Sequence, residues 1–370
     1  MNRRGVLLAG VAASAIASPI PVRAARRTRL ALVLPLTGVQ STVANELLTG
    51  YQMAANHAQS LGQEMELVVE DDRSEPARTA TAVRSFALAR SITALSGIVG
   101  TPHAMASLPE ARAAQLPVIG LRSGAASLRD GKPGVYHLRA SYEAELTQML
   151  RMVSFTMPAV SVVYSSDAFG KAALAHLQTI SKGHGVEITQ TIAADRNGAD
   201  IERATERAVD RNGKSQVVIL LMITKPALAG IAKARALGFL GPIFTMSFTA
   251  GGEMVSAGPQ VVRGVALVSA FPLPRSGVDD LATAFRYEAD ALGRSELTSS
   301  LTAFEGFTYG TVVARAAAKA TGGSRAELVA GLLAAQGARV GQRTLKFDSS
   351  LSGMDFLQFL YFDRDAILRT

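Results

Sequence analysis

Apolar positions along this chain follow two alternating patterns, short continuous runs and runs at helical spacing. From residue 29 onward, each short apolar run, typical of a buried strand, leads into a segment such as the one in which Leu47, Leu48, Tyr51 and Ala54 share a helix face. Strands that alternate with amphipathic helices predict a parallel sheet with helices on both faces.

The rhythm restarts near residue 140 without a Ser- or Pro-rich linker, so the sequence predicts an α/β fold of two doubly wound parallel-sheet domains that the chain crosses more than once. The expected strands are residues 30–34, 65–69, 97–100, 117–121, 135–139, 160–164, 186–189, 216–222, 242–246, 344–347 and 356–362. The expected helices are residues 46–60, 77–90, 104–114, 143–154, 171–181, 201–211, 227–237, 278–292, 303–320 and 325–335.

The first 24 residues have the pattern of a cleavable signal peptide. Arg3 and Arg4 are followed by small and apolar residues at 5–17, and residues 22–24 suit cleavage before Ala25. The apolar run is shorter than the roughly 20 residues of a membrane span. A twin-arginine signal also fits, but an ordinary secretory signal is the favoured interpretation. Without cysteine no lipid anchor follows, so we expect the mature chain to be free in the periplasm.

Composition and charge exclude several classes of protein. The 370 residues, 48% hydrophobic and 18% charged, suit a globular chain of two domains. The absence of cysteine excludes disulfides, zinc–thiolate sites, iron–sulfur clusters and cysteine nucleophiles. The leader holds three of the 38 basic residues and none of the 30 acidic ones, which leaves +5 of the net charge of +8. These charges are dispersed apart from residues 26–29, so we expect no nucleic-acid partner.

Motifs for catalysis are missing from the sequence. The five histidines are dispersed, and no HExxH, GxSxG, GxxxxGK[ST] or GxGxxG pattern occurs. Two pairs of adjacent acids, at residues 71–72 and 279–280, are better explained as helix caps or solvated loops. We therefore expect no enzyme, no metal and no cofactor.

Short segments spread along the chain carry a family pattern, each weak alone but all in the family's order. They are a strand with a P-L-T-G turn at residues 30–38, the T-G pair at 49–50, the D-D-R-S-E-P loop within 68–76, and residues 98–100, 116–119, 136–139, 167–170, 234–238, 309 and 345–348. Together they span nearly the whole mature chain. They resemble the leucine/isoleucine/valine-binding family of periplasmic solute receptors, which serve ABC importers.

The resemblance implies a type I periplasmic binding protein-like fold that closes like a Venus flytrap on a ligand in the interdomain cleft. It implies transport of a small amino acid or carboxylate-bearing ligand, with an inner-membrane permease as partner. A ligand-sensing module that signals through a partner protein is the alternative, because the same fold serves both. Three hinge crossings are implied near residues 139–142, 269–272 and 347–353, with an N-terminal domain of 25–140 plus 273–348 and a C-terminal domain of 141–272 plus 349–370.

The family's ligand positions, transferred by resemblance, give a candidate site. Ala104 stands where amino-acid receptors use a Ser to hold the ligand carboxylate, and Ser247 falls near the acid that pairs with the ligand ammonium. We therefore expect leucine, isoleucine and valine to bind poorly, and a carboxylate without an ammonium to bind better. The candidate ligand-binding residues are Val43, Thr101, His103, Ala104, Arg122, Ser123, Gly124, Tyr142, Phe169, Thr224 and Ser247.

Several of these residues also have an ordinary structural explanation. Arg122 is either a solvated loop residue or a bidentate clamp for a carboxylate. His103 fits the surface as well as a ligand contact, Phe169 fits the core as well as the cleft, and Tyr142 fits packing between domains. Ser123 and Gly124 are expected to act through backbone N–H groups.

Overall fold

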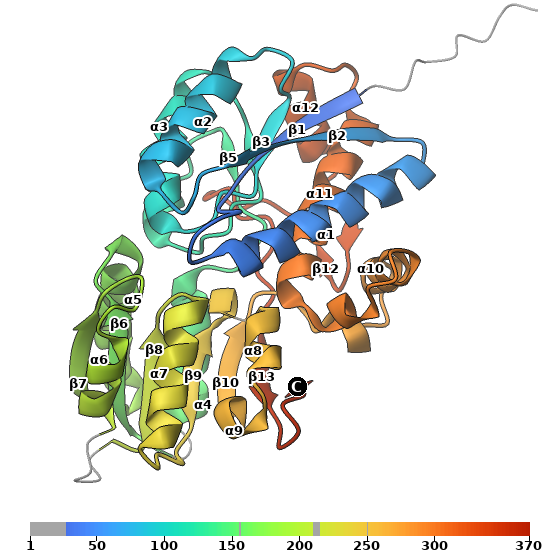
Figure 1. The fold of residues 1–370 in the computed structure, drawn as a ribbon. Coiled ribbons are helices and arrows are strands. Elements are labelled where there is room, and N and C mark those ends of the chain that lie inside the picture. The colour runs from blue at the N-terminus through green and yellow to red at the C-terminus, as the bar shows by residue number, and fades with distance from the viewer. Residues whose placement is uncertain (1–26, 155–156, 210–214, 250) are drawn as a thin grey trace, which may run out of the picture.

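The computed structural model describes residues 27–154, 157–209, 215–249 and 251–370. In these residues the chain forms two α/β domains, each built on its own sheet (Figure 1). The expected leader and its cleavage site before Ala25 lie outside the described residues. No helix in the described part of the chain is long and apolar enough to cross a membrane.

The first sheet is parallel and has five strands in the order β2-β1-β3-β4-β5. Strand β1 is buried on both faces: Ala31 and Val33 pack toward α2 and α3, whereas Leu30, Leu32 and Leu34 pack toward α1 and α11. The strands are β1 (Arg27–Leu34), β2 (Glu64–Asp71), β3 (Ala94–Ser96), β4 (Val118–Ile119) and β5 (Val135–Tyr136). The helices of this domain are α1 (Ser41–Ser60), α2 (Pro76–Leu88), α3 (Thr101–Ala113), α10 (Asp280–Ala291), α11 (Leu301–Lys319) and α12 (Arg325–Ala334).

The second sheet has seven strands in the order β14-β13-β10-β9-β8-β6-β7. The strands are β6 (Ala159–Ser165), β7 (Glu187–Ala194), β8 (Val217–Leu221), β9 (Ile243–Met246), β10 (Val265–Ser269), β13 (Gln358–Phe362) and β14 (Leu368–Arg369). The helices of this domain are α4 (Tyr142–Ser154), α5 (Ala168–Ser181), α6 (Ile201–Ala208), α7 (Thr224–Ala236), α8 (Gly252–Ser256) and α9 (Pro259–Val262). A two-stranded hairpin, β11 (Arg339–Val340) and β12 (Arg343–Thr344), lies outside both sheets.

The second sheet differs from the expected all-parallel sheet at one edge. Strand β13 pairs antiparallel with β10, and β14 pairs antiparallel with β13. The chain leaves β10 at the interdomain side and returns to β13 from that same side, without a helix crossover. A strand entered in this way runs opposite to its neighbour.

Two expected strands are displaced. The strand expected at residues 97–100 is wrong, because β3 ends at Ser96, and Gly97 and Gly100 have φ angles of 76° and 97° that turn the chain toward α3. The strand expected at 344–347 is instead the short β12. Strand β10 was not expected from the sequence, although all five of its residues are buried.

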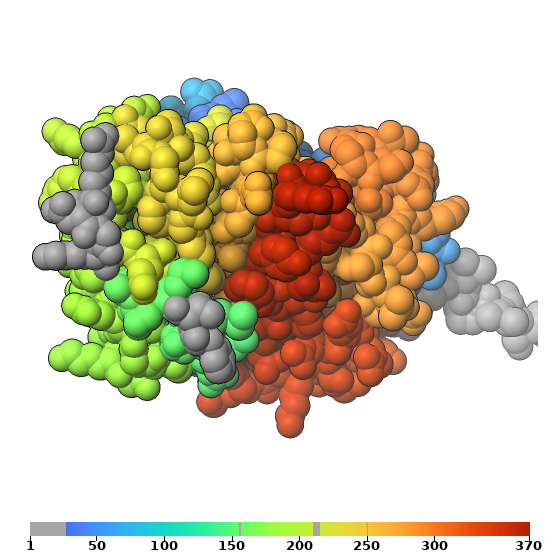
Figure 2. Space-filling model, turned by 90° about the horizontal axis from the view of Figure 1, so that it is seen from below, coloured from blue at the N-terminus to red at the C-terminus, as the bar shows by residue number. Residues whose placement is uncertain are grey.

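The chain passes between the domains after β5, after β10 and again before β13. At the last passage, the N–H of His137 donates to the carbonyl of Leu351 (2.9 Å), and the N–H of Gly353 donates to the carbonyl of His137 (2.8 Å). Residues 351–353 therefore still lie against the first sheet before the chain enters β13. In Figure 2 the C-terminal segment (red) runs over the surface between the second-domain helices (yellow) and the α10 region (orange).

Candidate ligand-binding site

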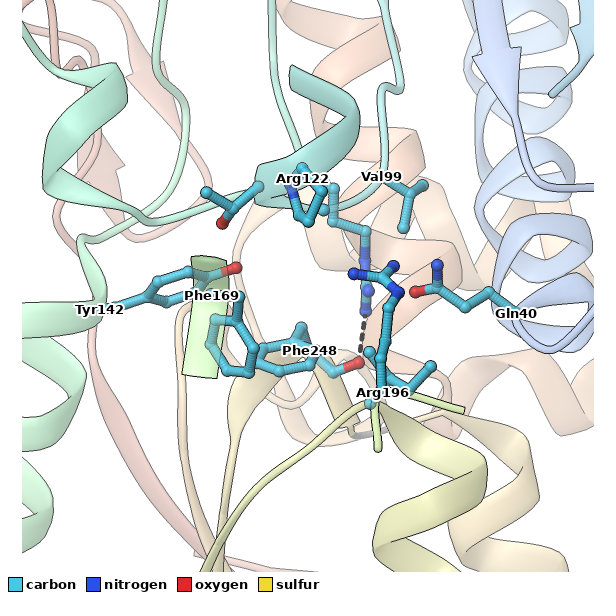
Figure 3. A pocket seen from close by; sticks show the side chains of 11 residues that line it. Gln40, Val99, Arg122, Tyr142, Phe169, Arg196 and Phe248 are labelled. Atoms are coloured by element: carbon cyan, nitrogen blue, oxygen red, sulfur yellow. Dashed lines mark hydrogen bonds between the residues drawn. The ribbon is translucent and has the colours of Figure 1, made fainter. Parts of the chain in front are cut away.

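A cavity lies between the two sheets, where loops that follow their parallel strands meet (Figure 3). Its empty volume, including the opening to solvent, is about 300 Å³. The carboxyl ends of parallel strands are the usual place for ligands in such sheets. The lining residues are Gln40, Val99, Gly100, Thr101, Pro102 and Arg122 from the first domain, and Tyr142, Phe169, Arg196, Ile223 and Phe248 from the second.

Three helices begin at this cavity. The residues that precede α1, α3 and α7 are Gln40, Gly100 and Ile223, all of which line it, and none of the three gives its helix a side-chain cap. The first N–H groups of a helix have no partner within the helix and carry partial positive charge. The cavity is therefore electropositive at three points before any side chain is considered.

Aromatic rings form one side of the cavity (Figure 3). The ring centroids of Phe169 and Phe248 are 4.6 Å apart at 89°, and those of Tyr142 and Phe169 are 5.2 Å apart at 69°. These edge-to-face contacts fix the rings as a rigid apolar wall. Burial raises the pKa of Tyr142, so its hydroxyl stays neutral at physiological pH.

Arg122, at the end of the β4 loop, is committed to protein partners. Its Nε donates to Glu305 Oε2 (2.9 Å), and its Nη2 donates to the Phe248 carbonyl (3.2 Å) and the Thr302 hydroxyl (3.3 Å). The bond to Phe248 joins the first domain to the second (Figure 3). With 2% of its side chain exposed, Arg122 is a buried connection between domains and not a solvated loop residue.

The charge network continues through the first hinge. Arg139 Nη1 donates to Glu305 Oε1 (2.9 Å), and its Nη2 donates to Glu145 Oε1 (3.2 Å) and to the Ser247 hydroxyl. Burial acts to lower the pKa of Arg139, but Glu305 and Glu145 raise it above its usual range. Burial raises the pKa of Glu145, against the donors Arg139 and Ser247. The two arginines and two glutamates balance each other and leave no net charge for a ligand.

Arg196 brings a second guanidinium into the cavity, from the loop after β7. Its Nη1 donates to Asp167 Oδ2, and its Nη2 is buried and has no hydrogen-bond partner. The Nε2 of Gln40, a residue only 6% exposed, is also buried without a partner. Among the eleven lining residues there are two arginines and no Asp or Glu.

The family model for periplasmic binding proteins matches residues 27–348. The chain belongs to the periplasmic binding protein family. This is a family of solute receptors located in the periplasm, and not a family of enzymes. A comparison with curated protein sequences finds no match.

Solved structures of periplasmic binding proteins share the fold over nearly the whole chain. A substrate-binding periplasmic protein of Ralstonia solanacearum is 25% identical, with a TM-score of 0.85 over 92% of this chain and 99% of that one. The branched-chain amino acid transporter substrate-binding protein LivJ of Streptococcus pneumoniae, in complex with isoleucine, is 16% identical, with a TM-score of 0.81 over 93% and 98%. The solute-binding protein of an ABC transporter from R. palustris, in complex with benzoate, is 18% identical, with a TM-score of 0.81 over 92% and 94%. The fold is thus that of substrate-binding proteins of ABC transporters.

The structure brings part of the expected periplasmic binding protein site to the cavity. Thr101, Arg122, Tyr142 and Phe169 line it. Ser123 lies directly behind the lining, where its hydroxyl is 2.9 Å from that of Thr101.

Gly124 lies where a side chain would collide with the start of α4. A Cβ at this position would lie 2.7 Å from Tyr142 Cδ1 and 2.8 Å from the Tyr142 backbone nitrogen. Its carbonyl accepts the Tyr142 N–H at 2.8 Å. Gly124 therefore allows the start of α4 to pack closely on the β4 loop.

The other expected residues are buried beside the cavity, outside its described lining. They are Val43, His103, Ala104, Thr224 and Ser247. At His103, Thr224 and Ser247 the cavity is lined instead by the preceding or following residue, which is Pro102, Ile223 or Phe248. Ser247 instead donates its N–H (3.0 Å) and hydroxyl (2.9 Å) to Glu145. Burial lowers the pKa of His103 to about 4, so this imidazole is neutral at physiological pH.

Seven lining residues are absent from the sequence-based set, and two of them, Gln40 and Arg196, carry a buried donor without a partner. Each lies between an expected strand and the expected helix that follows it, which is where a doubly wound sheet places ligand contacts. That position in the sequence is the one sign that would have indicated them. It does not reveal which residue of each loop turns inward.

A larger hollow, of about 1520 Å³ including open solvent, lies at the opposite end of the first sheet. Two of its cations have structural partners: Arg325 donates to backbone carbonyls of five residues, among them Ile92 and Ala114, and Arg112 pairs with Asp130. This hollow lies at the amino-terminal ends of β4 and β5, away from the carboxyl ends where such sheets bind ligands.

Proposed function

We propose that this periplasmic binding protein is the solute receptor of an ABC importer and binds a small carboxylate-bearing ligand between its domains. One observation carries the proposal. The interdomain cavity combines unpartnered buried donors, on Gln40 and Arg196, with an apolar aromatic wall. A carboxylate satisfies the donors, and an apolar body fits the rings.

The known ligands of similar structures support this chemistry. The receptor from Streptococcus pneumoniae holds isoleucine and the one from R. palustris holds benzoate, and both ligands carry a carboxylate on an apolar body. An amino acid also brings an ammonium group, which needs an acceptor or an acid. The described lining of this cavity provides no acid, so we propose that leucine, isoleucine and valine bind poorly here.

Transport requires that the importer distinguish the loaded receptor from the empty one. In this chain the Arg122 bond to the Phe248 carbonyl and the Arg139 bonds to Glu145 and to the Ser247 hydroxyl cross between the domains. These contacts support a closed form that a membrane permease would recognise by shape. We further propose that the first 24 residues are a signal peptide that delivers the chain to the periplasm.

Calorimetry on residues 25–370 tests the proposal, with benzoate, leucine and 4-methyl-2-oxopentanoate, the deaminated keto acid of leucine. We expect the two acids to bind and to reduce the radius of gyration in small-angle scattering, because binding favours domain closure. Absence of binding by all three compounds, with no change of shape at millimolar concentration, would contradict a carboxylate receptor.

A further inference from the structure

Each carboxylate bonded to a cavity arginine already uses both of its oxygens as acceptors. The cavity therefore has more hydrogen-bond donors than free acceptors. Asp167 uses Oδ1 to cap α5 through the Gly170 N–H (3.0 Å) and Oδ2 to hold Arg196 Nη1. This pair fixes the guanidinium plane of Arg196, so that its second nitrogen, Nη2, is left over. Figure 3 shows the Arg196 head group and the Gln40 amide turned toward the same part of the cavity.

The opposite wall adds partial positive charge. Gly100, with φ of 97°, leads into α3 without a side-chain cap, and a Cβ built on it would lie 3.8 Å from Arg196 Nη2. The N-terminus of α3 and the free nitrogen of Arg196 thus approach one another from different domains. An anion between them would receive bonds from both.

We propose that Arg196 is the residue that determines ligand specificity in this cleft. Its Nη2 and the Nε2 of Gln40 hold the anionic head of a small monocarboxylate that has no ammonium group. This inference rests on the proposed receptor function and narrows its ligand class. It also moves the expected carboxylate clamp from Arg122, whose described bonds go to Glu305, Phe248 and Thr302, to Arg196.

Two consequences follow from placing the cation on the second domain. An α-ammonium beside Arg196 Nη2 meets another N–H donor and no free acceptor, whereas a carboxylate gains a charge-assisted bond. In addition, the ligand connects Arg196 to Gln40 and α3 of the first domain, so the contact that selects the anion also closes the cleft.

The test is calorimetry on residues 25–370 of the wild type, Arg196→Gln, Arg196→Lys and the control Arg203→Gln, with benzoate, 4-methyl-2-oxopentanoate and leucine. Arg203 is a matched control because it lies on α6 of the same domain with 79% of its side chain exposed. We expect the wild type to bind the keto acid more tightly than leucine. Because a hydrogen bond to a charged group is lost, Arg196→Gln should weaken both acids about ten- to a hundred-fold.

The ratio of keto-acid to leucine affinity separates a specificity role from a structural one. This ratio should fall in Arg196→Gln, recover in part in Arg196→Lys, and remain within about twofold of wild type in Arg203→Gln. Equal acid affinities in Arg196→Gln and Arg203→Gln would overturn the inference and leave the receptor function intact. Tighter binding of leucine than of the keto acid by the wild type would also overturn the inference and leave the receptor function intact. If no compound binds the wild type, both the inference and the proposed function fail.

Discussion

Removing the charge of Glu305 is expected to destabilise the protein strongly, because this one carboxylate serves two buried arginines. Its Oε2 accepts the Arg122 Nε (2.9 Å), and its Oε1 accepts the Arg139 Nη1 (2.9 Å) and the Tyr309 hydroxyl (2.7 Å). The exposed fractions of the Arg122, Arg139 and Glu305 side chains are 2%, 1% and 4%. Glu305→Gln keeps the shape and leaves two buried cations facing one glutamate, Glu145.

Losing one partner of a buried ion pair costs about 3–5 kcal/mol of folding free energy. We expect Glu305→Gln to lose stability in this range, measured as the free energy of unfolding from urea titrations followed by far-ultraviolet circular dichroism. Tyr309→Phe removes only one neutral donor from the same carboxylate and should cost about 1 kcal/mol. The two variants therefore separate charge from hydrogen bonding.

The control is Glu296→Gln, at an ion pair with the same N–O distance. Glu296 Oε1 lies 2.9 Å from Arg294 Nε, but 66% of the Glu296 side chain is exposed. Water screens such a pair, so we expect no measurable change in stability. If Glu305→Gln is as mild as Glu296→Gln, the charges are hydrated in the free protein, and the argument that these buried ion pairs stabilise the fold is refuted.

Three further predictions concern pH, the hinge and processing. Burial lowers the pKa values of His103 and His137 to about 4 and about 3. The free energy of unfolding should therefore be at its full value above the ordinary imidazole pKa near 6.5 and fall as the pH drops below it, by up to about 1.4 kcal/mol per pH unit for each histidine. In urea titrations, His137→Gln should remove one of the two contributions. Gly124→Ala places a Cβ 2.7 Å from Tyr142 Cδ1, so we expect about 1–3 kcal/mol of destabilisation in the same assay, and wild-type stability would contradict the close packing. Mass spectrometry of the periplasmic fraction should find a chain that begins at Ala25, and an intact first residue would disprove the signal peptide.

The sequence predicted the fold well because strands and helices of a doubly wound domain have strong local patterns. The fully buried run in β1 and the helical spacing in α1 are visible without any tertiary information. Strand β3 shows the limit: three residues are too few for a period, and apolar residues continue past Ser96. Only the positive φ of Gly97 decides where it ends. Strand β10 lies between Gly264 and Pro272, turn residues that would have indicated it.

The site was less predictable because its partners are remote in sequence. Arg122 and Glu305 are separated by 183 residues, and Arg139 and Ser247 by 108. No local sequence pattern reveals such pairs. The sequence therefore predicted that Arg122 lines the cavity but not that its guanidinium is paired with Glu305. Likewise, Ser247 is next to the cavity residue Phe248, and a shift of one residue decides which of them a ligand meets.

The preference of the cavity for an anion follows from counting its free hydrogen-bond donors and acceptors, and not from the residue types alone. Acids do lie near the cleft, but Glu305 and Asp167 each use both carboxylate oxygens. Glu46 accepts the Gly252 N–H and the Ser300 hydroxyl, both at 2.7 Å, and burial raises its pKa. A ligand ammonium would have to displace one of these donors, whereas a carboxylate can accept from Arg196 Nη2 and Gln40 Nε2, which have no partner. An unpartnered buried donor is costly to leave in place, so the gain in free energy comes from a ligand that supplies acceptors.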